Sequence, residues 1–182
     1  MRYGEFKINQ AENVRLCNDL FLGDKLYFKG HILTQEDIVV FKSFKIYSVF
    51  GVIFEEGDVD YKTAQHQIAA QVSGKGLGYI TDDSGVCKIV ATSEGIFISD
   101  ESRIDKFNRA NEHIVLNIVK PYRVVKSGDI VAELEVVPPL ITEAEIDDII
   151  FRLSGNESLL RIDEVRDKKA VLIYTHFLNT NL

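Results

Sequence analysis

The chain has 182 residues, of which 46% are hydrophobic and 27% are charged, with two cysteines and three prolines. This composition is close to that of average globular proteins, and a chain of this length buries about 70% of its unfolded surface without disulfides or metals. It excludes intrinsically disordered chains and small disulfide-stapled scaffolds. The formal net charge of −7 argues against nucleic acid as a partner, because binding to phosphates depends on clustered Lys and Arg.

The sequence also predicts a cytoplasmic protein with no membrane partner. Its longest apolar stretch, residues 47–54, is interrupted by Ser48 and Gly51 and is far shorter than the roughly 20 residues of a membrane span. The first ten residues lack the apolar core of a signal peptide. Cys17 and Cys87 have no metal-ligand spacing, so we expect them to be small core residues.

Residues 1–56 form the first predicted module, which opens with short strands of mixed character. Thr34 and Asp37 have the spacing of a capping box, which predicts the start of a short helix. Residues 45–54 are rich in β-branched and aromatic side chains and predict a strand that follows this helix.

Residues 57–138 form the second predicted module, a helix followed by a small β-barrel or sandwich. Apolar residues at helical spacing predict a helix over residues 59–72, which Gly74 is expected to end. Turn residues then separate short runs of β-forming residues. The expected strands are residues 77–81, 87–92, 95–99, 114–119 and 130–137, and a short helix over residues 101–109 interrupts them.

Residues 139–182 form the third predicted module, which starts after the strand-ending Pro138-Pro139. Thr142 and Glu145 have capping-box spacing, and the apolar residues that follow predict a linker helix before Gly155. A strand over residues 159–165 is expected next. The fold class predicted from these three modules is α+β: a mainly β small barrel or sandwich with a few short helices, a C-terminal linker helix and a stranded tail.

The last apolar run, residues 170–174, has five consecutive apolar residues without alternation. Such runs are typical of parallel strands covered on both faces, so this run predicts the start of a truncated α/β domain. With no cover of its own, the tail is expected either to pack back on the linker helix or to mediate self-association. The linker-helix residues expected to receive it are Ile146, Ile149, Ile150 and Leu153.

No catalytic or metal-binding constellation is evident in the sequence. Acidic residues cluster at 55–60 and 143–148. Each cluster lies at the start of a predicted helix, where carboxylates are favourable, so neither cluster indicates a metal site. No local pattern pairs two histidines as ligands or places a nucleophile beside a base. The four histidines are His31, His66, His113 and His176.

Four segments within residues 14–141 carry a resemblance to a known family through their order along the chain. The first, residues 29–38, has the sequence KGHILTQEDI and is similar to the pattern Lys-Gly-x-x-Leu-Thr-x-x-Asp-Ile. The others are Gly57-Asp58-Val59 before the helix with Ala64 and Ala69; Ile104-Asp105, Asn108, Glu112 and Leu116; and Val125, Gly128, Val131, Ala132 and Pro138. Together they resemble the N-terminal region of molybdopterin-binding proteins related to the molybdopterin molybdotransferase (gephyrin-like) family.

The resemblance implies a role in molybdenum-cofactor biosynthesis. In the family, molybdopterin binding and chemistry belong to an α/β domain that would follow Tyr174, so no cofactor is expected in this chain. Residues 85–89 also depart from the Gly-Arg-x-Asn-Leu that is common in the family, which removes two polar side chains from that hairpin. The resemblance therefore implies a module without catalytic residues.

The leading hypothesis is a non-catalytic accessory module that positions or dimerises a molybdopterin-binding α/β domain, with that domain or a second copy as its partner. An alternative is a stand-alone enzyme or small-ligand-binding protein. Its ligand site would be the turn formed by Lys29, Gly30 and His31, where a cation and an imidazole stand beside a helix start. A second alternative is a degenerate remnant without activity.

Overall fold

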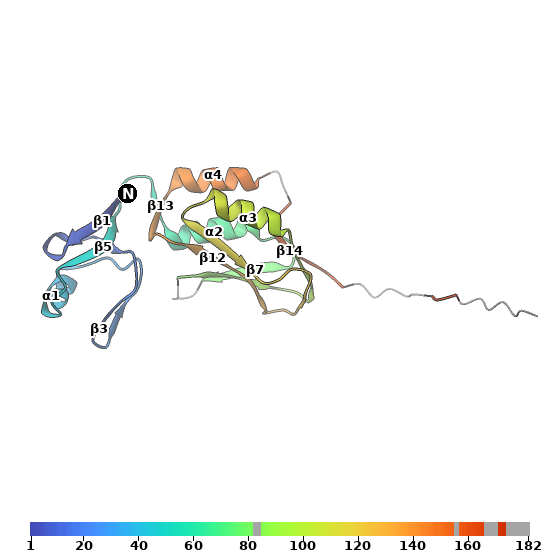
Figure 1. Ribbon diagram of the computed structural model, residues 1–182, viewed down its shortest axis with the longest axis horizontal. Coiled ribbons are helices and arrows are strands. Elements are labelled where there is room, and N and C mark those ends of the chain that lie inside the picture. Colours follow the sequence, from blue (N-terminus) through green and yellow to red (C-terminus); the bar gives the residue numbers. More distant parts are fainter. Residues whose placement is uncertain (82–84, 155–156, 166–170, 174–182) are drawn as a thin grey trace, which may run out of the picture.

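The computed structural model describes residues 1–81, 85–154, 157–165 and 171–173. Within these ranges, fourteen strands and four α-helices form an α+β fold in which every paired strand is antiparallel. The chain forms two lobes, each with its own hydrophobic core (Figure 1). The predicted α+β, mainly β class is confirmed. No helix in the described part of the chain is long and apolar enough to cross a membrane.

The N-terminal lobe is built on a three-stranded sheet in which β5 (Ser48–Ile53) lies between β1 (Arg2–Lys7) and β2 (Arg15–Leu16). A hairpin of β3 (Leu20–Leu22) and β4 (Lys25–Tyr27) follows β2, and a 3₁₀ helix covers Ile8–Gln10. The core of this lobe includes Tyr27, Leu33, Ile38, Phe41 and Val49.

Helix α1 (Gln35–Ser43) begins with the predicted capping box. The Thr34 side chain accepts a hydrogen bond from the Asp37 backbone N–H, and the Asp37 side chain accepts one from the Thr34 backbone. The strand predicted from residue 45 starts only at Ser48. Lys45 has a φ of +61°, so the chain leaves the helix through a left-handed residue before it becomes extended.

The second lobe contains a four-stranded sheet in the order β10 (Ile114–Ile118), β12 (Ile130–Val136), β8 (Cys87–Ala91) and β7 (Leu77–Thr81). Alternate residues of β8 are buried, and helix α2 (Tyr61–Val72) packs against β8 and β12. Cys87 is buried in this layer, and Cys17 is buried in the first lobe, as expected of small core residues.

Two smaller sheets complete the second lobe. Strand β9 (Gly95–Ser99) lies between β11 (Val124–Val125) and β14 (Leu160–Asp163). Strand β6 (Asp58–Asp60) pairs with β13 (Leu140–Thr142). Because β14 and β13 complete sheets with earlier strands, residues 141–149 and 159–162 contribute to the same core as the strands before Pro138.

This pairing explains why α2 is shorter than predicted. Residues 59 and 60, expected to be helical, belong to β6, and Asp60 caps α2 by accepting a hydrogen bond from the Lys62 N–H at 2.9 Å. At the other end, the helix stops when Ser73 becomes extended, not through a left-handed glycine. Gly74 serves another purpose, because a Cβ there would lie 2.7 Å from the Leu160 carbonyl oxygen.

Helices α3 (Glu101–Ala110) and α4 (Glu143–Leu153) agree with their predictions within a few residues. Thr142 caps α4 by accepting a hydrogen bond from the Glu145 N–H at 3.3 Å, which is one of the two hydrogen bonds of the predicted capping box. The Glu145 carboxylate lies 3.1 Å from His113 Nδ1, so this carboxylate ties α4 to the start of β10.

The predicted packing of the tail on α4 is wrong for the three tail residues that the structure describes. Val171, Leu172 and Ile173 are 84%, 93% and 83% exposed, and they lie beyond the body of the second lobe (Figure 1). Ile146 and Ile149 of α4 are instead buried in the core of that lobe. The other two residues of the expected strand, at positions 170 and 174, lie outside the described residues.

Candidate functional site

The predicted ligand turn lies in a pocket between the two lobes. This interface pocket has a volume of about 340 Å³ and is lined by residues 25–31 of the N-terminal lobe and residues 60–62 at the start of α2. The predicted site residues Lys29, Gly30 and His31 all line it. In the structure, the turn that the sequence singled out lies beside the beginning of α2. Nothing in the sequence indicated this contact.

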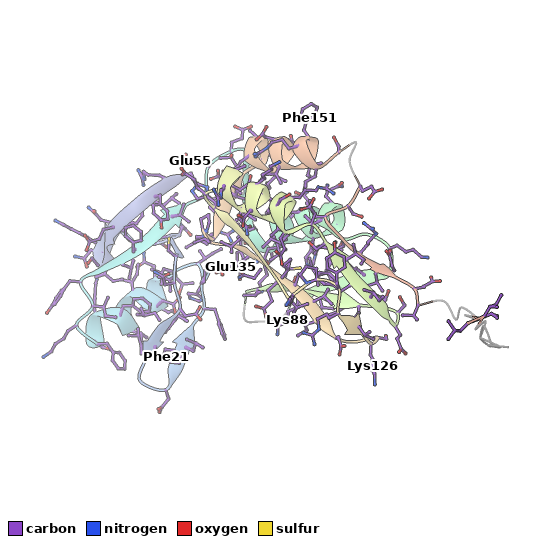
Figure 2. The ribbon with its side chains drawn as sticks, turned by 45° about the vertical axis from the view of Figure 1, so that its right-hand side comes forward. Phe21, Glu55, Lys88, Lys126, Glu135 and Phe151 are labelled. Carbon is purple, nitrogen blue, oxygen red and sulfur yellow. The ribbon has the colours of Figure 1, made fainter. Side chains whose placement is uncertain are left out.

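Lys29 links the lobes. Its Nζ donates a hydrogen bond to the carbonyl oxygen of Val136 at 2.7 Å, and it lies 3.6 Å from Glu135 Oε1. The same ammonium lies 4.8 Å from the centroid of the Tyr61 ring, within the range of a cation–π contact. Glu135 is seen at the junction of the two lobes in Figure 2. Burial lowers the pKa of Lys29, and the neighbouring Glu135 carboxylate opposes this effect.

Gly30 allows the turn to approach Tyr61. Its φ is +84°, a conformation that L side chains rarely adopt, and a Cβ there would lie 3.0 Å from Tyr61 Cε1. Its backbone N–H donates to the Leu16 carbonyl at 2.8 Å, which fixes the turn to the first lobe. Both features indicate that Gly30 serves the geometry of the contact between the two lobes.

His31 faces the helix cap. Its Nε2 lies 2.8 Å from Asp37 Oδ2, where the imidazole N–H donates to the carboxylate. Burial disfavours the charged form of Asp37, but the bonds from His31 and from the backbone and hydroxyl of Thr34 outweigh it and lower the pKa of Asp37 to about 2. His31 therefore stabilises the N-terminal cap of α1 through Asp37.

The sequence did not identify Tyr61 or Lys62 as site residues. The ammonium groups of Lys29 and Lys62 lie 4.8 and 6.0 Å from the centroid of the Tyr61 ring. The signal that could have found them is Asp60, whose acid at a helix start places the first turn of α2. No sequence pattern relates that turn to residue 29, because the contact depends on how the two lobes meet.

The charges around the interface pocket nearly cancel. Lys25 lies 3.6 Å from Asp37, Lys29 lies 3.6 Å from Glu135, and Asp60 forms an ion pair with Arg15 at 2.9 Å. Of the ammonium groups that line this pocket, only that of Lys62 has no ion pair within the described ranges. Most charged groups around this pocket are thus paired with one another.

Apart from His31, the described histidines do not line the interface pocket, and neither cysteine does. Burial raises the pKa of Cys17, which keeps this thiol protonated at neutral pH. Three of the histidines lie apart from one another, with His31 on Asp37, His66 on Thr81 and His113 on Glu145. His176 lies outside the described residues. In the part of the chain that the structure describes, no group of three or more His, Cys, Asp or Glu side chains could hold a metal ion.

Comparison of the chain with protein-family models, with curated proteins and with solved structures gave no match.

Proposed function

We propose that this chain is a non-catalytic module that positions or dimerises a molybdopterin-binding α/β domain in molybdenum-cofactor biosynthesis. The proposal starts from the resemblance of residues 14–141 to the gephyrin-like family. The observation that carries it is the use made of residues 29–38: Lys29 and Gly30 join the two lobes, while Thr34 and Asp37 cap α1. The most family-like segment therefore serves to hold the lobes in a defined orientation.

The other resembling residues also have structural positions. Ile104 and Leu116 are buried in the core of the second lobe. Between them, Asn108 hydrogen-bonds both backbone groups of Leu116, with Nδ2 3.0 Å from its carbonyl oxygen and Oδ1 2.9 Å from its nitrogen. Residues that maintain a fold in this way support a positioning module more than an enzyme.

The interface pocket does not fit molybdopterin well. The pterin carries a phosphate, and the Lys29 ammonium that would meet it is already bound to the Val136 carbonyl and paired with Glu135. The carboxylates of Asp37 and Asp60 beside the same pocket are paired with Lys25 and Arg15, so Lys62 is the one lining ammonium without an ion pair in the described residues. We therefore assign molybdopterin to the partner α/β domain and derive no chemistry from it in this chain.

The test is association with such a domain. The purified chain is mixed with a molybdopterin-binding α/β domain of the gephyrin-like family, and complex formation is measured by analytical ultracentrifugation. We expect a defined complex, or a dimer of this chain that carries the domain. In parallel, calorimetric titration of the chain alone with molybdopterin and with molybdate is expected to give no micromolar binding.

Two results would overturn the proposal. The first is the absence of any complex or dimer at concentrations of tens of micromolar. The second is micromolar binding of molybdopterin or molybdate by the chain alone that a Lys29→Gln substitution abolishes. That result would assign the interface pocket to the stand-alone binding function instead.

A further inference from the structure

A second pocket lies between helices α3 and α4, away from the lobe interface. This α3–α4 groove has a volume of about 420 Å³. Its floor is formed by the apolar side chains of Phe107, Ile149, Leu153 and Leu159. A pocket of this size with an apolar floor and few polar groups has the character of a small-molecule site.

The two helices present one face each to the groove. On α3, the lining residues Arg103, Lys106, Phe107 and Ala110 follow the i, i+3, i+4, i+7 spacing of a single helix face. Arg152 lines the groove from α4. Cationic side chains thus stand on both sides of an apolar floor.

The cations on the α3 side form no ion pair within the described residues, although Arg103 lies near enough to the Asp100 carboxylate to help lower the pKa of Asp100. Arg103 uses one N–H on the backbone carbonyl of Glu157, at 2.6 Å. Within the described ranges, neither Arg103 nor Lys106 forms an ion pair. On a chain with a net charge of −7, two cations without an ion pair that face one groove are a local reversal of charge.

The third cation is held in place by its neighbours. Arg152 donates to Asn111 Oδ1 at 2.8 Å and pairs with Asp148 at 2.8 Å. The Asn111 amide also donates to the carbonyl of Phe107, so the end of α3 and the end of α4 are joined at the groove. Counting Arg103, Lys106 and Arg152 against the carboxylates of Asp148 and Asp100 leaves one net positive charge.

From this geometry we propose that the α3–α4 groove binds a small organic anion, a carboxylate or phosphate ester on an apolar ring body. The ring lies on the apolar floor and the anionic group meets Arg103 and Lys106, where a charge-assisted hydrogen bond is stronger than a neutral one. None of these residues lines the interface pocket, so this proposal does not depend on the proposed function.

The probe is 2-naphthoate, with 2-naphthylmethanol as its neutral analogue and inorganic phosphate as an anion without a ring. Affinities are measured by calorimetry, and the site is mapped by backbone amide shifts in NMR spectra. We expect 2-naphthoate to bind at least tenfold more tightly than either comparison compound. The largest shifts are expected at residues 103–111 and 149–153.

Two double variants separate the groove from a general effect of charge. Arg103→Gln with Lys106→Gln is expected to weaken 2-naphthoate binding at least tenfold. Arg109→Gln with Lys126→Gln removes the same charge from exposed positions outside the groove and is expected to change binding less than twofold. Ala110 is exposed at the groove, so Ala110→Phe should fill it and block the probe without disturbing the core.

The proposal is overturned if 2-naphthoate and its neutral analogue bind equally well, or if both double variants lose the same affinity. It is also overturned if the amide shifts map to residues outside the groove. Retained binding in a folded Ala110→Phe variant, checked by its thermal unfolding curve, would have the same meaning.

Discussion

The ammonium of Lys29 donates a hydrogen bond to the backbone carbonyl of Val136, a residue 107 positions further along the chain. The two residues belong to different lobes with separate hydrophobic cores. The contact between Lys29 and Val136 is therefore polar, whereas packed elements meet mostly through apolar side chains. The Lys29 side chain is only 15% exposed, so this bond is shielded from the water that would otherwise replace it.

We predict that Lys29→Gln lowers the free energy of unfolding by about 1.5–3 kcal/mol, the range for a hydrogen bond to a charged group. The measurement is urea denaturation, together with hydrogen exchange of the amides in β12. Lys126→Gln, at an exposed turn, serves as the matched control and should change stability by less than about 0.5 kcal/mol. Equal stability of the two variants would show that Lys29 does not join the lobes.

A glycine pair can test the close approach of the turn to Tyr61. Gly30 and Gly57 have nearly the same φ, +84° and +87°, but only Gly30 faces a neighbour, the Tyr61 ring at 3.0 Å from an added Cβ. Gly57→Ala should cost about 1–2 kcal/mol for the left-handed conformation alone. Gly30→Ala should cost more, by about 1 kcal/mol or above, because the ring must also move.

The readout is the difference in thermal denaturation between the two alanine variants. A larger loss for Gly57→Ala, or equal losses, would contradict the assigned role of Tyr61. Because the φ values match, the difference isolates the steric contact.

The pKa of Asp37 makes the stability of the first lobe depend on acid. The pKa of this carboxyl is lowered from 3.8 to about 2 in the folded protein, so the folded state binds its proton less readily than the unfolded state. The stabilisation is therefore complete above about pH 4 and is lost as the pH falls toward 2. A shift of this size corresponds to about 2 kcal/mol.

Asp37→Asn should remove this dependence between pH 4 and 2, and it should lower the stability at pH 7 because the carboxylate also completes the α1 cap. Stability is followed by urea denaturation at each pH. Asp24→Asn, an exposed position in the β3–β4 turn, is the comparison and should leave the profile unchanged. An unchanged profile in Asp37→Asn would disprove the role of the carboxylate.

The Asn108 side chain bonds the edge of the second-lobe sheet as a neighbouring strand would. Its amide bonds both backbone groups of Leu116 in β10. Asn108→Ala leaves a buried segment with two unmet backbone groups, and we expect a loss of about 2–3 kcal/mol. Asn117→Ala, an exposed neighbour on the same strand, is the control. Faster hydrogen exchange at the Leu116 amide should accompany the loss; unchanged exchange would refute the assignment.

The sequence predicted the elements whose signals are local. The cap at Thr34, the short helix α3 and the strand β8 depend on residues a few positions apart, and their predictions are confirmed. The errors arise where distant pairing decides. Residues 59 and 60 were expected in a helix, but pairing of β6 with β13 makes them a strand.

The candidate site shows the same division. The turn at Lys29–His31 was visible as a glycine beside a helix cap, and the structure places it in a pocket. Its partners Tyr61 and Val136 come from the second lobe, and only the arrangement of the two lobes brings them to the turn. The α3–α4 groove was likewise not predicted. Cationic side chains on a helix are ordinarily explained by a solvent-exposed helix face, so those of α3 and α4 gave no signal of a groove.

The exposed tail gives the last prediction. Val171, Leu172 and Ile173 present three large apolar side chains to solvent, and covering them on another copy would gain about 1.5–3 kcal/mol for each. We therefore expect the full chain to associate in a concentration-dependent manner in sedimentation experiments. A chain that ends after Val165 keeps β14, whose Leu160 and Ile162 are buried, so it should stay folded with an unchanged melting temperature. It should also be monomeric, and Leu172→Asp in the full chain should weaken the association in the same direction. If the full and shortened chains sediment alike at every concentration, the tail does not mediate self-association.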